Sequence, residues 1–356
     1  MKKIDFFLLI SVLFLTLFGL FMIYDASSFV AFRDFADKYH YVKDQIFWVI
    51  LGIVALAIFS RIDYHKFYNL AVPILLIALG LLVAVFIPGV GVKVLGAHRW
   101  INLKFTVLQP SEFVKLALAI YLAAWFSSKE KGRIWAFLLL LFSVLALVML
   151  EPDMGTAAII LAEGIVLYFL SGAKLMYFAV LTPVLAISGF IFAKLEPYRA
   201  ARLATFLNVN ENINSTSYHV RQILIALGSG GLMGVGLGNS LQKYAYLPEN
   251  ATDSIFAIIA EELGVLGACF IIVVFLVVIW RGFYIAVNAK DVFGKLLAGG
   301  IITFLAAQIF INLAAQTALL PLTGIPLPFI SYGGSALIIN LSAIGILINI
   351  GRQKKI

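Results

Sequence analysis

Apolar runs of roughly twenty residues, the length that carries an α-helix across the hydrocarbon core of a bilayer, recur along almost the whole of this chain. The composition agrees with them, because 63% of the 356 residues are hydrophobic and only 12% are charged. Such values exclude an ordinary soluble domain. We therefore predict an all-α polytopic membrane protein, with residues 1–356 forming one integral membrane domain.

The apolar runs predict about ten transmembrane helices. A largely polar segment, 194–251, separates the seventh from the eighth. Inside it, HVRQILIAL (219–227) is apolar but too short to span, which predicts a re-entrant or interfacial helix within a large extracytoplasmic loop. The predicted spans are 6–24, 45–60, 68–87, 111–127, 134–150, 154–171, 175–193, 252–280, 296–320 and 333–351.

The distribution of Lys and Arg orients these helices, because short cytoplasmic loops carry an excess of both. The short loops on one side, together with both tails, are rich in them, so we predict that both termini are cytoplasmic and that 194–251 lies outside. The rule that places Lys and Arg in cytoplasmic loops does not explain basic residues in outer loops. An anionic partner accounts for them, with attraction to anionic lipid headgroups as the alternative; they include Arg199, Arg202, Arg221 and Lys243.

Asp253 stands where the polar outer segment turns into the eighth span, in YAYLPENATDSIFAIIAEELG (244–264). A carboxylate at the edge of an apolar helix costs desolvation free energy unless it is paired or used, so it indicates a catalytic site at the membrane surface. The alternative is that Thr252 or Asp253 only caps the helix. The glycine run GSGGLMGVGLG (228–238) just upstream either brings backbone N–H groups close to a phosphate or serves helix packing.

Polar residues also occur where apolar ones are expected. Glu112 and Lys115 are three apart near the start of the fourth span, so they share a helix face and can pair. Lys115 then either reaches back to the outer surface or points into a cavity. Glu163 falls in the middle of the sixth span and should face the bundle interior, whereas Glu151 and Asp153 are expected to be solvated turn residues.

The segment LLPLTGIPLPFISYGGSALIINL (319–341) holds three prolines and three glycines and no charge. A plain connecting loop is seldom so apolar. Such a segment can dip into the bilayer or form the floor of a cavity, where Ser331, Tyr332 and Ser335 would offer polar groups.

Seven sequence blocks, taken together and in this order, resemble the signature of the SEDS family, the shape, elongation, division and sporulation proteins. The resemblance extends from the first predicted span to the tenth, and two of the blocks are closer to the division branch, typified by FtsW, than to the elongation branch. One departure is Ala251, which stands where the family usually has His. The blocks are GAHRWI, QPSEFVK, EPDMGT, PYRAARL, QILIALGSGGLMGVGLGNSLQK, YLPENATDSIFAIIAEELG and LPFISYGGS.

The resemblance implies a peptidoglycan glycosyltransferase of the bacterial cytoplasmic membrane. Its substrate would be lipid II, a disaccharide-pentapeptide carried on undecaprenyl pyrophosphate, which it would polymerise for cell division or elongation. Asp253 would be the catalytic base that takes the proton from the acceptor sugar's 4-hydroxyl. The implied substrate-binding residues are Arg99, Glu112, Lys115, Arg199, Arg202, Gln222, Lys243 and Ser331.

The resemblance also implies partners. A class B penicillin-binding protein would cross-link the glycan and dock on spans eight and nine, and small bitopic division regulators would join it. We expect a membrane-bound protein with no nucleic acid partner. A divalent cation, Mg or Mn, would be optional, with Asp253 as its candidate ligand, because oxygen ligands suit such hard cations.

A lipid II flippase is the alternative from another class of function. Buried acids and a lysine would then form a relay across the membrane, as intramembrane ionisable residues often do. The polar residues crowd the outer half of the predicted bundle, however, which favours chemistry at the surface over a path through it. The relay candidates are Glu112, Lys115, Glu163, Glu261 and Glu262.

Overall fold

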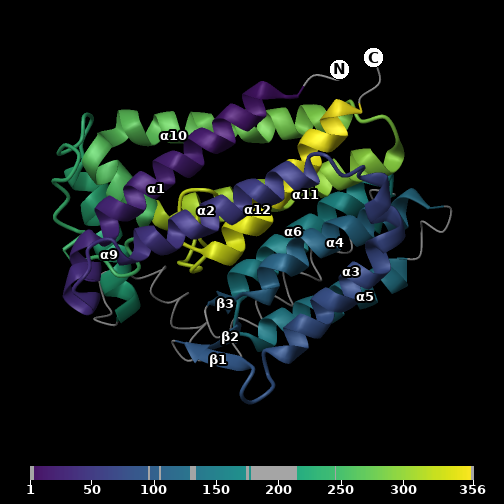
Figure 1. The fold of residues 1–356 in the computed structure, drawn as a ribbon, viewed down its shortest axis with the longest axis horizontal. Coiled ribbons are helices and arrows are strands. Elements are labelled where there is room, and N and C mark those ends of the chain that lie inside the picture. Colours follow the sequence, from purple (N-terminus) through teal and green to yellow (C-terminus); the bar gives the residue numbers. More distant parts are fainter. Residues whose placement is uncertain are drawn as a thin grey trace.

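The computed structural model describes residues 4–94, 97–103, 106–128, 134–173, 176–177, 215–244 and 246–353. Long helices lie side by side along the length of the molecule, with three short strands below them (Figure 1). The helices are α1 (Phe6–Phe35), α2 (His40–Phe59), α3 (His65–Ala84), α4 (Pro110–Ser127), α5 (Ile134–Leu150), α6 (Met154–Leu170), α9 (Ser215–Ser229), α10 (Ile255–Val287), α11 (Val292–Gln316) and α12 (Gly334–Arg352).

This arrangement is that of a polytopic helical membrane protein. Among the described residues, six helices are long and apolar enough to cross a bilayer, namely α1, α2, α3, α10, α11 and α12. Every predicted span except the seventh has a helix at its place. The seventh, 175–193, lies almost entirely outside the described residues.

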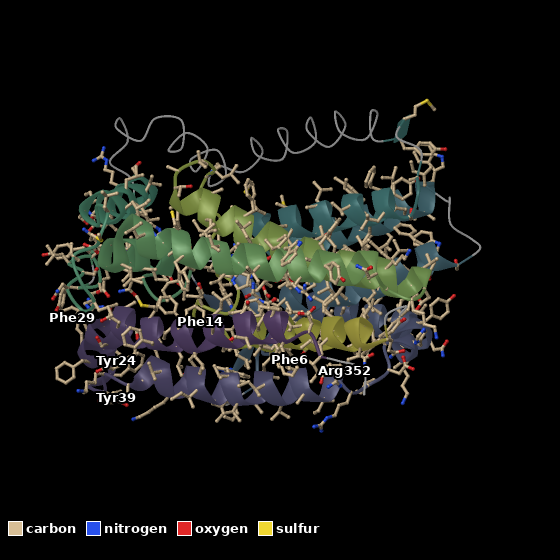
Figure 2. The ribbon with its side chains drawn as sticks, turned by 90° about the horizontal axis from the view of Figure 1, so that it is seen from above. Phe6, Phe14, Tyr24, Phe29, Tyr39 and Arg352 are labelled. Carbon is tan, nitrogen blue, oxygen red and sulfur yellow. The ribbon has the colours of Figure 1, made fainter. Side chains whose placement is uncertain are left out.

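The two ends of the described chain lie on the same side of the bundle. Figure 2 shows Phe6 of α1 near Arg352 of α12, whereas Phe29 and Tyr39 lie toward the opposite end. Contacts agree with this view, because Arg352 donates to the carbonyl of Ser60 at 3.2 Å, at the end of α2.

The three strands correct the prediction of an all-α chain. β1 (Gly91–Val94), β2 (Ala97–Asn102) and β3 (Val107–Leu108) form an antiparallel sheet in that order, between α3 and α4. A small sheet with open edges leaves backbone N–H and C=O groups unpaired, and these need water or protein partners that lipid cannot supply. The sheet therefore belongs outside the hydrocarbon region.

The predicted eighth span is two helical segments and not one. Gly264 interrupts α10 with φ 68° and ψ −172°, a conformation that is essentially confined to glycine. Before the break, Ile255–Glu262 is buried within the protein. After it, side chains such as Val265, Leu266 and Phe270 are exposed, as expected for a helix that faces lipid.

The glycine run 228–238 packs directly on this break. Val235 N–H donates to the carbonyl of Glu261 at 3.0 Å, and Val265 N–H donates to that of Gly231 at 2.9 Å. A Cβ on Gly230 would lie 2.1 Å from the carbonyl oxygen of Ala260, so only glycine permits the approach. Of the two roles considered for these glycines, the structure supports close backbone packing.

We predict that Gly264→Ala strongly destabilises the protein. Its Cβ would lie 2.3 Å from the backbone nitrogen of Gly234, and the backbone conformation alone costs about 1–3 kcal/mol for a residue other than glycine. Thermal unfolding in detergent should show a clearly lowered midpoint. The matched control is Gly80→Ala in α3, where nothing lies within 4 Å of the added Cβ and alanine is favoured in a helix by about 0.5–1 kcal/mol. Equal midpoints for the two variants would contradict the packing.

Candidate active site

Asp253 lies in a turn immediately before α10. Ser254 occupies the N-cap position, so neither Thr252 nor Asp253 is the cap that the sequence offered as an alternative. The helix start is satisfied from another element, because Ala257 N–H donates to Oε1 of Gln316 on α11 at 2.8 Å. Capping therefore does not account for the presence of Asp253.

The backbone of this turn is fixed at three successive residues. Tyr332 N–H donates to the carbonyl of Ala251 at 2.9 Å, and the Ser331 hydroxyl donates to that of Thr252. Nδ2 of Asn312 donates to the carbonyl of Asp253 at 2.9 Å. The turn is thus held by α11 and by the proline-rich segment 319–333.

The carboxylate of Asp253 is half-buried and lies at the edge of this framework. The Thr252 hydroxyl lies 3.2 Å from its Oδ1 and 2.8 Å from Oε2 of Glu249. On the other side, a Cβ added to Gly324 would be 3.8 Å from Asp253 Oδ2. The backbone of Gly324 has φ +71°, a conformation that favours glycine.

Lys115 points into the protein interior, which decides between the two orientations that the sequence left open. Its ammonium pairs with Oε2 of Glu112 at 2.9 Å and donates to Oε1 of Gln308 at 2.7 Å. Lys115 and Glu112 are 0% and 2% exposed. Since Gln308 and Asn312 are one turn apart on α11, the Lys115 pair and the Asp253 turn are attached to neighbouring positions of one helix.

Glu163 is fully buried on α6, as its position in the sequence predicted. Its two carboxylate oxygens have no hydrogen-bond partner among the described residues.

Glu151 and Asp153, in contrast, are not the solvated turn residues that we expected, since they are 0% and 4% exposed. Asp153 caps α6 by accepting from Thr156 N–H at 3.0 Å.

Arg99 projects from β2 onto the turn between α5 and α6. Its Nε donates to the carbonyl of Glu151 at 3.0 Å, and its guanidinium also donates to that of Pro152. The side chain predicted to bind substrate therefore ties the small sheet to this turn. The carboxyl of Glu151 lies beside it; burial and the nearby Asp153 raise the pKa of this group to about 8, while Arg99 opposes the rise.

Lys243 is engaged in a buried ionic cluster. Its ammonium lies 2.9 Å from Asp25 of α1 and 3.1 Å from Glu262 of α10, and its side chain is 5% exposed. Burial opposes the charge of Lys243, but the two carboxylates outweigh burial and raise the pKa of the ammonium. Glu261 next to it accepts hydrogen bonds from the hydroxyls of Ser240 and Ser229. The cluster fastens the loop after α9 to α1 and α10.

Four further predicted site residues complete the list, and one of them, Ser331, is already engaged in the protein. Gln222 lies on α9, partly exposed, and Ser331 is buried and used to hold the Thr252 carbonyl. Arg199 and Arg202 lie outside the described residues. Sequence reasoning missed His219 of α9, whose Nε2 lies 2.7 Å from the Ser254 hydroxyl next to Asp253.

Sequence reasoning also missed three side-chain amides on α11. Gln308, Asn312 and Gln316 follow one another at intervals of four residues in AAQIFINLAAQ (306–316). This spacing places them on one helix face, and polar residues inside an apolar span are expected to be buried and used. That signal was present in the sequence.

Comparison with known proteins identifies the family. The family model of the cell cycle proteins FtsW, RodA and SpoVE matches residues 6–356. This chain belongs to that family. It is 40% identical to stage V sporulation protein E of Bacillus subtilis, covering 99% of this chain and 98% of the relative. It is 39% identical to a probable peptidoglycan glycosyltransferase FtsW of Geobacter metallireducens, covering 99% and 96%.

Solved structures share the fold of this chain. A chain in a structure on the coordination of polymerization and crosslinking by a peptidoglycan synthase complex superimposes with a TM-score of 0.81, at 23% identity, covering 99% of this chain and 98% of that one. The rod shape determining protein RodA of Thermus thermophilus gives a TM-score of 0.73 at 25% identity, covering 99% and 98%. The family member described here therefore has the RodA-like fold.

We predict that Glu151 makes stability fall with rising pH. Its carboxyl has a pKa of about 8 in the folded protein against an ordinary value of 4.5, so the folded state holds the proton more tightly than the unfolded state. This contribution is fully present below about pH 4.5 and is lost as the pH rises through 8. Thermal unfolding at pH 5 and pH 9 should show a larger loss of midpoint for the unmodified protein than for Glu151→Gln. Identical losses would contradict a raised pKa for this buried carboxyl.

Proposed function

We propose that this protein is a peptidoglycan glycosyltransferase that polymerises lipid II on the outer face of the bacterial cytoplasmic membrane. The observation that carries the proposal is the Asp253 turn, whose backbone is fixed at three carbonyls while the carboxylate stays half-buried beside Gly324. The names of relatives such as the probable FtsW glycosyltransferase, alike over nearly the full length, support it.

In this proposal Asp253 acts as the general base. Its carboxylate takes the proton from the 4-hydroxyl of the acceptor sugar while that oxygen forms a bond to the anomeric carbon of the donor. The bond from the anomeric carbon to the diphosphate breaks, and the configuration inverts. General-base assistance of this kind contributes about 10²- to 10⁴-fold to the rate.

The leaving diphosphate needs positive charge. Arg199, Arg202 and Gln222 remain proposed substrate contacts on the outer side. Arg99, which is held by the carbonyls of Glu151 and Pro152, would have to exchange them for substrate. Lys115 enters the site with Glu112 already paired to it, so the pair is neutral as a whole and contact with an anion requires Lys115 to exchange partners. Ser331 and Lys243 serve the site in this proposal by holding its loops, because both are already engaged inside the protein. The substrate would then bind beside the Asp253 turn, whose backbone is already held in place before binding.

A divalent cation fits the site only together with substrate. Among the described residues, no group of three or more His, Cys, Asp or Glu side chains gathers to hold a metal. Asp253 and Glu249 do flank one hydroxyl, and Mg²⁺ is commonly held by one or two carboxylates plus substrate phosphates. These two residues would hold Mg or Mn, which would neutralise the leaving diphosphate.

Ten spans with both termini cytoplasmic are part of the proposal. The shared side of Phe6 and Arg352 supports an even number of crossings (Figure 2). The sheet lies where α3 ends and α4 begins, next to the turn between α5 and α6. Placing this end outside puts Asp253 and the loop around α9 on the face where lipid II is polymerised.

The flippase alternative has less support. A relay needs ionisable groups that can exchange protons or partners in succession across the membrane. Glu261 and Glu262 are instead fixed by Ser240 and Lys243 at the contact between α10 and the loop after α9. Their role is accounted for by packing, without transport.

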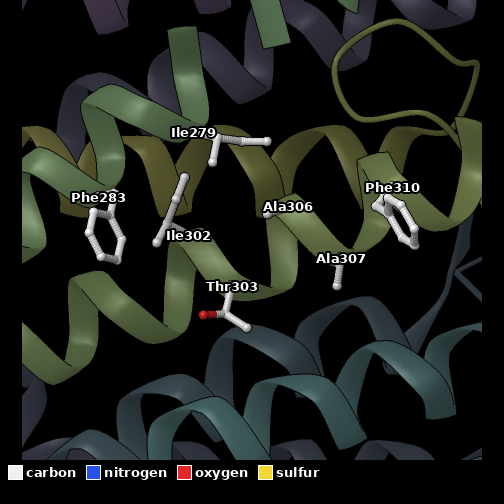
Figure 3. Close-up of a pocket in the computed structure, with 7 residues that line it drawn as sticks. All are labelled: Ile279, Phe283, Ile302, Thr303, Ala306, Ala307 and Phe310. Atoms are coloured by element: carbon white, nitrogen blue, oxygen red, sulfur yellow. The ribbon is translucent and has the colours of Figure 1, made fainter. Parts of the chain in front are cut away.

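A class B penicillin-binding protein is the proposed partner, docking through a membrane helix. A shallow groove of about 380 Å³ runs between α10 and α11 on the outside of the bundle (Figure 3). Three of its lining side chains, Thr303, Ala306 and Ala307, are small. Small residues let a second helix approach closely within a membrane. The lining residues are Ile279, Phe283, Ile302, Thr303, Ala306, Ala307 and Phe310.

Filling the groove should weaken the complex with the transpeptidase and leave folding intact. We expect Ala306→Trp to lower co-purification of the partner several-fold, because a bulky ring would occupy the space for its helix. The matched control is Leu139→Trp on α5, which is 70% exposed on another face. Recovery of the partner with Ala306→Trp at the level of the control would contradict docking at this groove.

The test of Asp253 separates a catalytic carboxylate from a structural one. Asp253→Asn keeps size and hydrogen-bonding ability but removes the basic oxygen at neutral pH, so folding should survive while lipid II polymerisation falls by about 10²-fold or more. Asp253→Glu should also fail, because a displacement of about 1 Å can cost about 10²-fold. The readout is glycan formed from labelled lipid II by the purified protein, with and without its transpeptidase.

The control for this test is Asp37→Asn, which changes an acid in the loop between α1 and α2 that pairs with Lys43 at 2.7 Å. It should polymerise lipid II as the unmodified protein does. If Asp253→Asn also polymerises near the unmodified rate, the carboxylate is structural and the assignment of the base is wrong.

A further inference from the structure

Three amide side chains on α11 form a buried ladder. Gln308, Asn312 and Gln316 are 0%, 2% and 1% exposed, and they follow one another by one helical turn. The ladder begins at the Lys115 ammonium and ends at the start of α10. Its side chains also bond to the Asp253 turn and to the proline-rich segment.

The partners of Gln316 and Asn312 determine which end of each side-chain amide is the oxygen and which is the nitrogen. Gln316 faces a backbone donor, Ala257 N–H, so its oxygen must point there. Its Nε2 then donates to Oδ1 of Asn312 at 2.7 Å. Nδ2 of Asn312 is consequently turned toward two carbonyl acceptors, Asp253 at 2.9 Å and Ile325 at 2.7 Å. Flipping either amide would therefore place donor against donor or acceptor against acceptor.

Gln308 repeats this arrangement one turn away. Its Oε1 accepts from the Lys115 ammonium, and its Nε2 donates to the carbonyl of Pro326 at 3.0 Å. Asn312 and Gln308 therefore hold successive carbonyls, those of Ile325 and Pro326, in the segment that follows Gly324. The same helix face sets the positions of Lys115, of this segment and of the Asp253 turn.

We propose that Asn312 and Gln316 are positioning residues for glycosyl transfer, acting through the backbone of Asp253. This inference rests on the proposed function. Asn312 anchors the Asp253 carbonyl and Gln316 keeps the Asn312 amide correctly turned, so together they determine where the carboxylate stands relative to Gly324. Because a shift of about 1 Å at a reacting group can cost about 10²-fold in rate, loss of this anchor should lower turnover more than substrate binding.

The first test replaces the anchor by an apolar side chain of similar size. Asn312→Leu should lower kcat for lipid II polymerisation by about tenfold or more, with KM changed less than about threefold, since the anchor does not contact substrate. Gln316→Met should lower kcat in the same direction, which gives a second variant should Asn312→Leu fail to fold. The matched control is Asn340→Leu on α12, a buried amide whose two polar atoms have no partner among the described residues; its kcat should be unchanged.

A double-variant cycle gives the readout that a merely structural role would not produce. If Asn312 acts through the Asp253 carboxylate, then Asn312→Leu or Gln316→Met should have little further effect on the residual rate of Asp253→Asn, because effects of residues that act as a unit are not additive. An equal fold-loss with Asp253 present and with Asp253→Asn would overturn the inference, as would an unchanged kcat in both single variants.

The same measurements separate this inference from the proposed function. If the unmodified protein, with its transpeptidase, makes no glycan from lipid II, the proposed function fails and this inference with it. If the unmodified protein is active and Asp253→Asn is equally active, the base assignment fails. If both behave as proposed while Asn312→Leu and Gln316→Met match Asn340→Leu, only the positioning role is overturned.

Discussion

The structure depends on one constraint, which is that backbone N–H and C=O groups at membrane depth need partners within the protein. Helices satisfy this by themselves, but the Asp253 turn, the break at Gly264 and the proline-rich segment do not. Two kinds of contact supply their partners. Glycines let the run 228–238 bond to the α10 backbone, whereas amides of α11 bond to the turn and to the proline-rich segment. Irregular backbone can therefore lie beside the proposed catalytic carboxylate without exposure to lipid.

The sequence was sufficient for features that depend on local composition. Hydropathy located the helices, and the carboxylate at the edge of a span gave Asp253 as the candidate base, which stays a prediction. It did not reveal the sheet, because three short strands leave little periodicity beside the strong signal of the spans. Nor did it reveal the partner of Lys243, since Asp25 lies 218 residues away along the chain and no local pattern records that contact. The role of the glycine run was ambiguous for the same reason. Its backbone hydrogen bonds to the interrupted helix α10 decided that role.

Basic residues illustrate why charge alone identified the site incompletely. Lys115 and Lys243 both looked like cations available to an anionic substrate, yet each is buried against carboxylates. A buried ammonium without such a counter-charge would carry a large desolvation penalty. In a membrane protein, a Lys or Arg predicted to be buried therefore indicates an internal ion pair as readily as it indicates a ligand site. Arg99, at the sheet, is likewise satisfied by backbone carbonyls.

Neutral amides suit the task of holding the Asp253 turn better than charged side chains would. A lysine or arginine at Asn312 could also donate to the carbonyls of Asp253 and Ile325. Its charge would, however, attract the carboxylate of Asp253 and, in the proposed mechanism, compete with the acceptor hydroxyl for it. It would also carry a desolvation penalty that an amide avoids. An amide has one donating and one accepting end, so the ladder fixes both position and direction while adding no charge beside the proposed base. The charged pair, Glu112 and Lys115, is kept at the far end of the ladder, where Gln308 connects it to the same helix face.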